Sequence, residues 1–383
     1  MKSNFIYLLP VSFIFFASFL GSAPYEGDIL VLKMYSLPRI LHDIAYVFYL
    51  ILIILFCFFG IARVSKHWRL FKPFFILVFS YFILLFWALV TANDYVRYFV
   101  IFLSVLLCPI GLLYVIEETD FKFFSKSVFY TFCLFVFLSV VYSFLNYATH
   151  PRVSGIHNNP NLMGIWLISL LTVALYLKDY INRSVFFLFL VVVSVLIILT
   201  GSRLAFAALF IMYTPIFLKF KFFSFLSLAF LIAYFLGNGN SLDMGFRAIE
   251  IGSAVSDSGR SLIWDRAIEC INTELLVGHG MGGAESCVKI GNVHNSYLRI
   301  AVMLGIPLAI LFFLSYFFFL AKVLTTPVNV FIKLYFIGLP IAFFAEDYLV
   351  GFASPFFPFF LFMLALLLFD LKKRKALIKE VKL

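Results

Sequence analysis

The sequence predicts an all-α fold, a polytopic helical bundle that spans a membrane, on three observations. Hydrophobic residues make up 64% of the 383 residues and charged residues 13%, with a mean hydropathy of +1.08. A soluble domain carries about 25% charged residues. The apolar residues form runs long enough to cross a bilayer, and the longest polar stretch, 237–294, is one loop between such runs. This composition excludes a water-soluble globular enzyme.

Runs of about 20 apolar residues predict about twelve membrane helices in one membrane domain over 1–383. The windows are 5–21, 43–62, 73–91, 98–116, 127–147, 161–177, 184–200, 204–218, 222–236, 295–318, 329–345 and 354–370. The count can change by about two, because several windows are short and only Gly201-Ser202-Arg203 separates the seventh from the eighth. No internal repeat is visible in the sequence.

The charges predict which side each loop faces. Placing the tail from Lys372 to Lys375 in the cytoplasm puts most of the 29 Lys and Arg residues inside and most of the 19 Asp and Glu residues outside. We therefore expect a bacterial inner-membrane protein with both termini cytoplasmic. The first segment resembles a signal peptide ending at Gly21-Ser22-Ala23, but Pro24 follows it and opposes cleavage.

The loop 237–294 is predicted to be periplasmic and functional, because long loops in compact domains usually carry function. Within it, residues 258–271 have the spacing of an amphipathic helix. The predicted apolar face consists of Leu262, Ile263, Ala267, Ile268 and Ile271. Trp264 suits a lipid–water boundary. The glycine-rich stretch 278–283 lacks a preceding strand and does not indicate a nucleotide site.

The five cysteines follow no metal-ligand spacing. Cys57, Cys108 and Cys133 lie in apolar runs, where packing explains them. Cys270 and Cys287 lie in the predicted oxidising compartment. They form either a disulfide that closes the loop or two free thiols.

Basic and imidazole groups gather at predicted helix N-termini on the outer side. These groups are Arg152 and His157 before the sixth helix, Arg203 at the eighth, and His294 with Asn295 and Arg299 at the tenth. Free N–H groups and the dipole attract anions to such termini, and guanidinium groups add bidentate phosphate recognition. Together with Arg260 and Arg266 of the loop, they predict a site for a multiply charged anion. Each has a simpler explanation: snorkelling for Arg203, solvation for Arg260 and Arg266, and helix capping for His294.

A metal site is a weaker hypothesis. Glu26 and Asp28 have an acid-x-acid spacing that suits Mg²⁺ or Mn²⁺, although a solvated loop explains them equally well. Glu346 and Asp347 are similarly ambiguous, and no His/Cys cluster indicates zinc. We therefore expect no metal and no cofactor.

The order of these motifs resembles the O-antigen ligase/polymerase superfamily, which contains Wzy O-antigen polymerases and WaaL O-antigen ligases. The motifs are Arg152-Val-Ser-Gly, Asn159-Pro-Asn161, Thr200-Gly-Ser-Arg203, Gly259-Arg260 with Trp264, Gly278-x-Gly280, Val293-His-Asn-Ser-Tyr297 and Gly305. They cover about residues 150–320.

The resemblance implies a metal-independent, inverting glycosyl transfer at the periplasmic face, with a donor glycan on undecaprenyl diphosphate. Arg203 and Arg260 look like the family's diphosphate-binding arginines, His294 like its general base, and Arg152 like a less firmly assigned basic position. The implied partners are the lipid-linked oligosaccharide and the bilayer, with a chain-length regulator as an optional partner and no nucleic acid.

Two activities share these motifs and differ in the acceptor. A polymerase extends another lipid-linked repeat, whereas a ligase transfers the glycan to lipid A–core. The stretch from Arg260 to His294 is shorter than in many ligases, which favours a polymerase. A polysaccharide transporter or flippase is the remote alternative, but transporters often show repeated halves and midplane charges.

Overall fold

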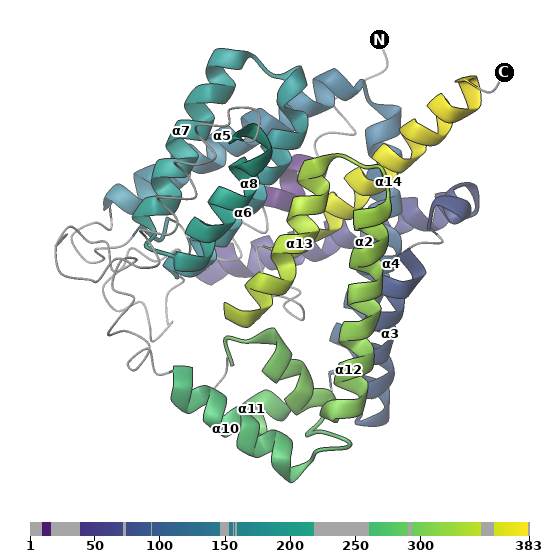
Figure 1. The fold of residues 1–383 in the computed structure, drawn as a ribbon, viewed down its shortest axis with the longest axis vertical. Helices are drawn as coiled ribbons and strands as arrows, with labels where there is room; N and C mark the ends of the chain where they lie inside the picture. The colour runs from purple at the N-terminus through teal and green to yellow at the C-terminus, as the bar shows by residue number, and fades with distance from the viewer. Residues whose placement is uncertain are drawn as a thin grey trace.

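The computed structural model describes residues 10–16, 39–71, 74–92, 94–145, 153–155, 157, 159–217, 260–289, 293–345 and 356–381. These residues form helices joined by turns and short loops, and no strand occurs among them. The helices pack side by side into one bundle, from which α10 and α11 project at one end (Figure 1). The predicted all-α fold class is confirmed.

The helices follow the hydropathy of the sequence. Their bounds are α2 Arg39–Phe71, α3 Phe75–Val90, α4 Tyr95–Glu118, α5 Phe121–Leu145, α6 Pro160–Leu177, η3 Lys178–Tyr180, α7 Arg183–Leu199, α8 Arg203–Phe217, α10 Arg260–Thr273, α11 Gly283–Cys287, α12 Ser296–Thr325, α13 Val330–Ala345 and α14 Phe357–Val381. Each predicted window in the described ranges overlaps a helix, whereas window 222–236 lies outside them.

Several helices are suited to a bilayer. Among the described residues, five helices are long and apolar enough to cross one: α2, α4, α5, α6 and α12. The helices α3, α7, α8 and α13 are apolar but shorter. The chain is therefore a multi-pass helical membrane protein, and the count of about twelve spans stays a prediction.

Helices α2 and α4 approach each other closely at two glycines. A Cβ on Gly60 would collide with the backbone carbonyl of Leu107, and one on Gly111 with that of Phe56. Small residues permit such close backbone approach in membrane helices, where van der Waals packing replaces the hydrophobic drive. This crossing anchors the core of the bundle.

One end of the bundle carries the charged helix ends, and we call it the basic end. Lys372 of α14 pairs with Glu117 of α4 at 2.6 Å. The backbone N–H of Asn329, before α13, donates to the Asp370 carboxylate of α14 at 2.6 Å. In Figure 1 the C-terminus lies at the top, at the opposite end from α10 and α11. The C-terminal helix, whose tail is predicted to be cytoplasmic, therefore ends away from α10 and α11.

Helix α12 is broken, which the sequence window 295–318 did not predict. Gly305 has non-helical dihedrals (φ 74°, ψ 166°) and Pro307 follows it. The break divides α12 into a short helix, Ser296–Leu304, and a longer part, 306–325. At 1.5 Å per residue the longer part alone spans about 30 Å, the thickness of the bilayer core. The predicted window 295–318 therefore contains a membrane-spanning candidate together with a break that the sequence analysis did not predict.

Candidate functional site

The loop between α10 and α11 caps the broken end of the short helix. The last carbonyls of a helix have no intrahelical donor. Here His279 N–H donates to Val302 O at 2.8 Å, and Gly280 N–H donates to Met303 O at 3.1 Å. The loop thus satisfies the carbonyls that the break in α12 exposes.

Glycines make this contact possible. Both Gly278 and Gly305 have positive φ, which L-residues with a Cβ rarely adopt. A Cβ on Gly305 would lie 2.5 Å from Leu276 O, and one on Gly278 would collide with Gly305 N. Across the break, Ile306 N–H donates to Leu275 O at 2.8 Å. The glycine-rich stretch therefore joins loop to helix, a role distinct from cradling a phosphate.

His294 and Asn295 stand at the N-terminus of the short helix. The Asn295 side chain caps the helix by accepting from Tyr297 N–H at 2.9 Å and Leu298 N–H at 3.1 Å. His294 is half-buried and left-handed (φ 51°), immediately before the cap. Arg299 lies one turn further on and is buried. We call this helix with α10, α11 and the loop between them the site end.

One indole of helix α10 contacts the backbone directly before His294. Trp264 Nε1–H donates to Val293 O, the carbonyl directly before His294, at 3.1 Å. Arg260 precedes Trp264 by four residues, so both lie on the same face of the helix. Arg260 is half-buried. The boundary role of Trp264 stays a prediction, and its indole also bonds the backbone before His294.

The buried face of α10 differs from the predicted apolar face. Ala267, Cys270 and Ile271 are buried, whereas Leu262 and Ile268 are exposed.

Arg266 is also exposed. It lies two residues beyond Trp264, about 200° around the helix at 3.6 residues per turn. Arg266 therefore lies on a different face of α10 from Arg260 and Trp264.

A disulfide fixes α10 to α11. Cys270 and Cys287 are bonded, with an S–S distance of 2.06 Å and Cα atoms 6.0 Å apart. His279 Nε2 lies 2.8 Å from Cys270 O and 3.1 Å from Thr273 Oγ1. The two sulfurs and the His279 imidazole lie within 4.8 Å of one another, a spacing compatible with a metal ion. Since both sulfurs are bonded to each other, this cluster is a structural clamp.

A second group of motif residues meets at the turn between α7 and α8. Thr200 Oγ1 accepts from Ser202 N–H at 3.2 Å, and Gly201 has a positive φ of 59°. This tight turn ends at Arg203, the first residue of α8. The prediction that Arg203 opens a helix is confirmed. Arg152, Glu26, Asp28, Glu346 and Asp347 lie outside the described residues.

The segment before α6 packs on this turn. Val153 N–H donates to Leu199 O at 3.1 Å. A Cβ on Gly164 of α6 would lie 2.6 Å from Ala205 Cβ. Asn159 caps α6 by accepting from Asn161 N–H at 2.8 Å. The motifs predicted before the sixth and eighth helices are therefore neighbours in space.

His157 belongs to this packing and carries no charge at neutral pH. Its side chain is fully buried and lies edge-on to Trp166, with ring centroids 5.3 Å apart. Burial disfavours the charged imidazolium and lowers the pKa of His157 to about 3. His157 is thus a structural residue of the core.

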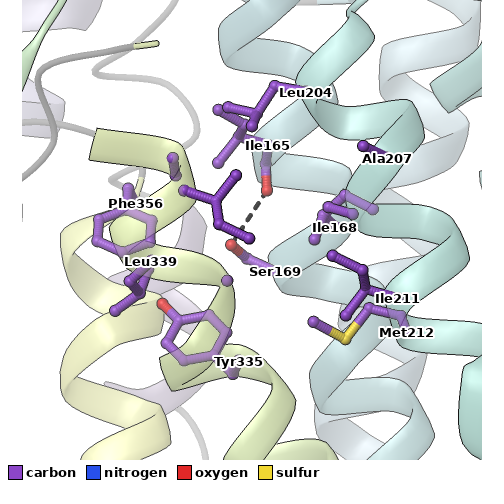
Figure 2. Close-up of a pocket in the computed structure, with 14 residues that line it drawn as sticks. Ile165, Ile168, Ser169, Leu204, Ala207, Ile211, Met212, Tyr335, Leu339 and Phe356 are labelled. Atoms are coloured by element: carbon purple, nitrogen blue, oxygen red, sulfur yellow. Dashed lines mark hydrogen bonds between the residues drawn. The ribbon is translucent and has the colours of Figure 1, made fainter. Parts of the chain in front are cut away.

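An apolar groove of about 500 Å³, part of it open to the surroundings, begins next to Arg203 (Figure 2). It lies between α6, α8 and α13, and its lining includes Leu204, Ile211 and Ile168. The one hydrogen bond drawn in the close-up is internal to α6, where Ser169 Oγ–H donates to Ile165 O at 3.0 Å. The lining is mostly apolar, with Tyr335 and Phe356 beside the aliphatic side chains, so this groove suits a hydrocarbon chain.

Tyr297 connects the short helix to the groove. Its hydroxyl donates to Pro340 O of α13 at 3.0 Å, and its ring packs on Phe344 at 4.6 Å between centroids. Pro340 stands between Leu339 and Ile341, which both line the groove. The His294 segment and the groove beside Arg203 therefore contact the same turn of α13.

Sequence reasoning missed two parts of this site. Trp87 of α3 donates its indole N–H to Met303 O at the break, and nothing in its apolar surroundings marks that contact. The break itself had a signal, since Gly305 and Pro307 stand two residues apart within an apolar run.

A comparison with known proteins finds one family. Residues 186–313, about a third of the chain, match the family described as O-Antigen ligase. This match supports the resemblance to the O-antigen ligase/polymerase superfamily. The O-antigen ligase match includes Arg203, Arg260, His294 and Arg299, and ends before α13. No curated protein matches the chain.

Proposed function

We propose that the chain is a membrane glycosyltransferase that acts on glycans linked to undecaprenyl diphosphate, with O-antigen polymerase as its activity. The match to the O-antigen ligase family supports a ligase or polymerase reaction. The observation that carries the proposal is the bond from Trp264 to Val293, which joins α10 to the backbone directly before His294. Arg260 begins the same helix, so this bond supports a site that combines His294 as a base with Arg260 as a cation for a leaving diphosphate.

His294 acts as the general base in this proposal. The acceptor hydroxyl oxygen attacks the anomeric carbon, and its proton passes to the imidazole. The bond between that carbon and the phosphate oxygen breaks, and its electron pair leaves with the lipid diphosphate. Attack from the face opposite the leaving group inverts the anomeric configuration.

The arginines stabilise the leaving group. Charge grows on the diphosphate as the glycosidic bond breaks, and preorganised guanidinium groups bind such charge bidentately. Arg203 and Arg260 are proposed for this role, with Arg152, Arg299 and Asn295 as further substrate contacts. Arg266 has least support, because it is exposed on another face of α10.

The groove supports a place for the lipid. A polyprenyl chain is a hydrocarbon whose diphosphate lies at one end. The aliphatic groove begins at Leu204, one residue after Arg203, so a chain lying in it brings its diphosphate to the start of α8. This arrangement also explains why the reaction occurs at a bilayer boundary.

We further propose that the site end faces the periplasm of the inner membrane. The basic end then lies in the cytoplasm, in agreement with the excess of Lys and Arg in cytoplasmic loops. The proposed topology has about twelve spans and cytoplasmic termini, and 237–294 is the large periplasmic loop.

The reaction is proposed to need no metal, because arginines neutralise the diphosphate. The test is synthesis of glycan by membranes treated with EDTA. Unchanged synthesis is expected, and a loss that Mg²⁺ or Mn²⁺ restores would return Glu26 and Asp28 to consideration.

O-antigen ligase is the second candidate, favoured by the description of the matched family. A lipopolysaccharide gel from a strain that lacks this gene separates the two. A core that carries a single repeat unit, without the ladder, indicates a polymerase. Bare core with accumulating lipid-linked polymer indicates a ligase. An unchanged ladder contradicts both and points to another glycan pathway or to a transporter.

A further inference from the structure

The short helix Ser296–Leu304 is not held by continuity with the rest of α12. Gly305 turns the backbone at its end, so the membrane part of α12 does not fix its direction. Every residue from 299 to 305 is nevertheless buried. Contacts from other elements must therefore set the position of this helix, and of His294 at its start.

Two indole groups contact its two ends. Trp264 of α10 donates to Val293 O, just before the N-terminus, at 3.1 Å. Trp87 of α3 donates to Met303 O, next to the C-terminus, at 3.0 Å. The donors come from helices distant in the sequence, and both helices pack against α12 (Figure 1).

We propose that Trp87 and Trp264 are positioning residues that brace the short helix and so hold His294 toward the substrate. The effect of these residues on catalysis rests on the proposed function. Their role in holding the short helix does not depend on it. An indole suits the task because it has a single N–H donor on a rigid ring. Each N–H therefore fixes one carbonyl in one direction.

The two contacts are not equivalent. Met303 O also accepts from Gly280 N–H at 3.1 Å, so it keeps a donor when the Trp87 indole is lost. The Trp264 indole donates to Val293 O, directly before His294, and Trp264 lies four residues after Arg260 in α10. This hydrogen bond therefore joins α10 directly to the His294 segment. We therefore expect Trp264 to matter more than Trp87.

The experiment uses the full chain in nanodiscs with Trp264→Phe, Trp87→Phe and the double variant. Phenylalanine keeps an aromatic ring but has no N–H. Amide hydrogen exchange over 294–304 is expected to rise about five- to tenfold in Trp264→Phe, which is what one hydrogen bond contributes. Trp166→Phe is the matched control, since Trp166 lies in α6 beside His157, and it should leave exchange in this segment unchanged.

The same variants are then expressed in a strain that lacks the gene, at equal membrane levels. Glycan formation is expected to fall about fivefold in Trp264→Phe and further in the double variant. Unchanged exchange in the double variant would overturn the brace. Raised exchange with full glycan formation would overturn its role in positioning His294. Full glycan formation by His294→Ala would instead refute the proposed function and leave the exchange result standing.

Discussion

At the basic end, Lys372 and Glu117 meet across α14 and α4 through side chains, and the Asp370 carboxylate accepts from Asn329 N–H. At the site end, the corresponding contacts run between backbones. The N–H groups of His279 and Gly280 reach carbonyls that the break in α12 leaves open. At the basic end the contacts join the ends of continuous helices. At the site end they surround the break in α12.

The difference predicts how each end responds to substitution. A side-chain pair in contact with solvent contributes little, because water solvates both charges once they separate. A backbone contact in the left-handed region depends on glycine, and a Cβ there displaces the whole segment. The site end should therefore be the more sensitive of the two, in stability as well as in activity.

The largest expected effect follows from His294→Ala. Without a group to accept the hydroxyl proton, glycan formation should fall about 10²–10⁴-fold. The readout is glycan synthesis by membranes that contain equal amounts of each variant. Lys372→Met at the basic end serves as the control and should retain activity within about twofold, because its ion pair is remote and solvated. Equal losses in both variants would contradict the division of roles between the ends.

Gly305→Ala should destabilise the chain by about 3 kcal/mol. A left-handed conformation disfavours alanine by about 1–2 kcal/mol, and the crowding against Leu276 O adds to this. Thermal unfolding in detergent measures the change. Gly338→Ala in α13 is the matched control: a Cβ there meets no atom within 4 Å, and alanine favours the helix. A Gly305→Ala protein as stable as the control would show that the break is not fixed by glycine.

Removing the disulfide should cost about 3 kcal/mol, the value for a loop of this length. Cys270→Ala and Cys287→Ala, singly and together, are expected to lower the unfolding temperature by similar amounts, because either change removes the same bond. Cys133→Ala, at a free thiol in α5, should change it less. Full stability of the double variant, with unchanged glycan formation, would mean that the clamp does not support the site.

Low pH should weaken the packing between α6 and the α7–α8 turn. His157 has a pKa of about 3 in the fold, against about 6.5 when unfolded, so the unfolded state binds the extra proton. Its stability contribution is complete above pH 6.5 and is lost as the pH falls toward 3, by about 2 kcal/mol at pH 5. Unfolding temperatures from pH 7.5 to 4.5 measure the slope. In His157→Asn the unfolding temperature should depend less on pH. An unchanged dependence in this variant would mean that another group causes it.

The smallest effect is expected at the ion pair of the basic end. Lys372→Met should change the free energy of unfolding by about 1 kcal/mol or less, since the Lys372 side chain is 40% exposed. Urea or thermal unfolding at low and high salt checks this. A loss as large as that of Gly305→Ala would show that the basic end is as sensitive as the site end.

The sequence by itself determined the fold class and the approximate positions of the helices. Hydropathy decides these because a helix in lipid must satisfy its own backbone and present apolar side chains. The sequence also located helix starts at Arg203 and after Asn295, since capping chemistry is local. The order of the short motifs gave a resemblance to a superfamily, which the family match over 186–313 supports.

Only the tertiary structure decided how these motifs meet. Hydropathy does not distinguish a continuous helix from one that stops at Gly305 and is capped by a loop, because both are apolar throughout. The partners of Val293 O and Met303 O lie 29 and 216 residues away in the chain, so no local pattern records them. His157 illustrates the same limit: the sequence shows an imidazole near a helix start, whereas burial against Trp166 decides that it stays neutral.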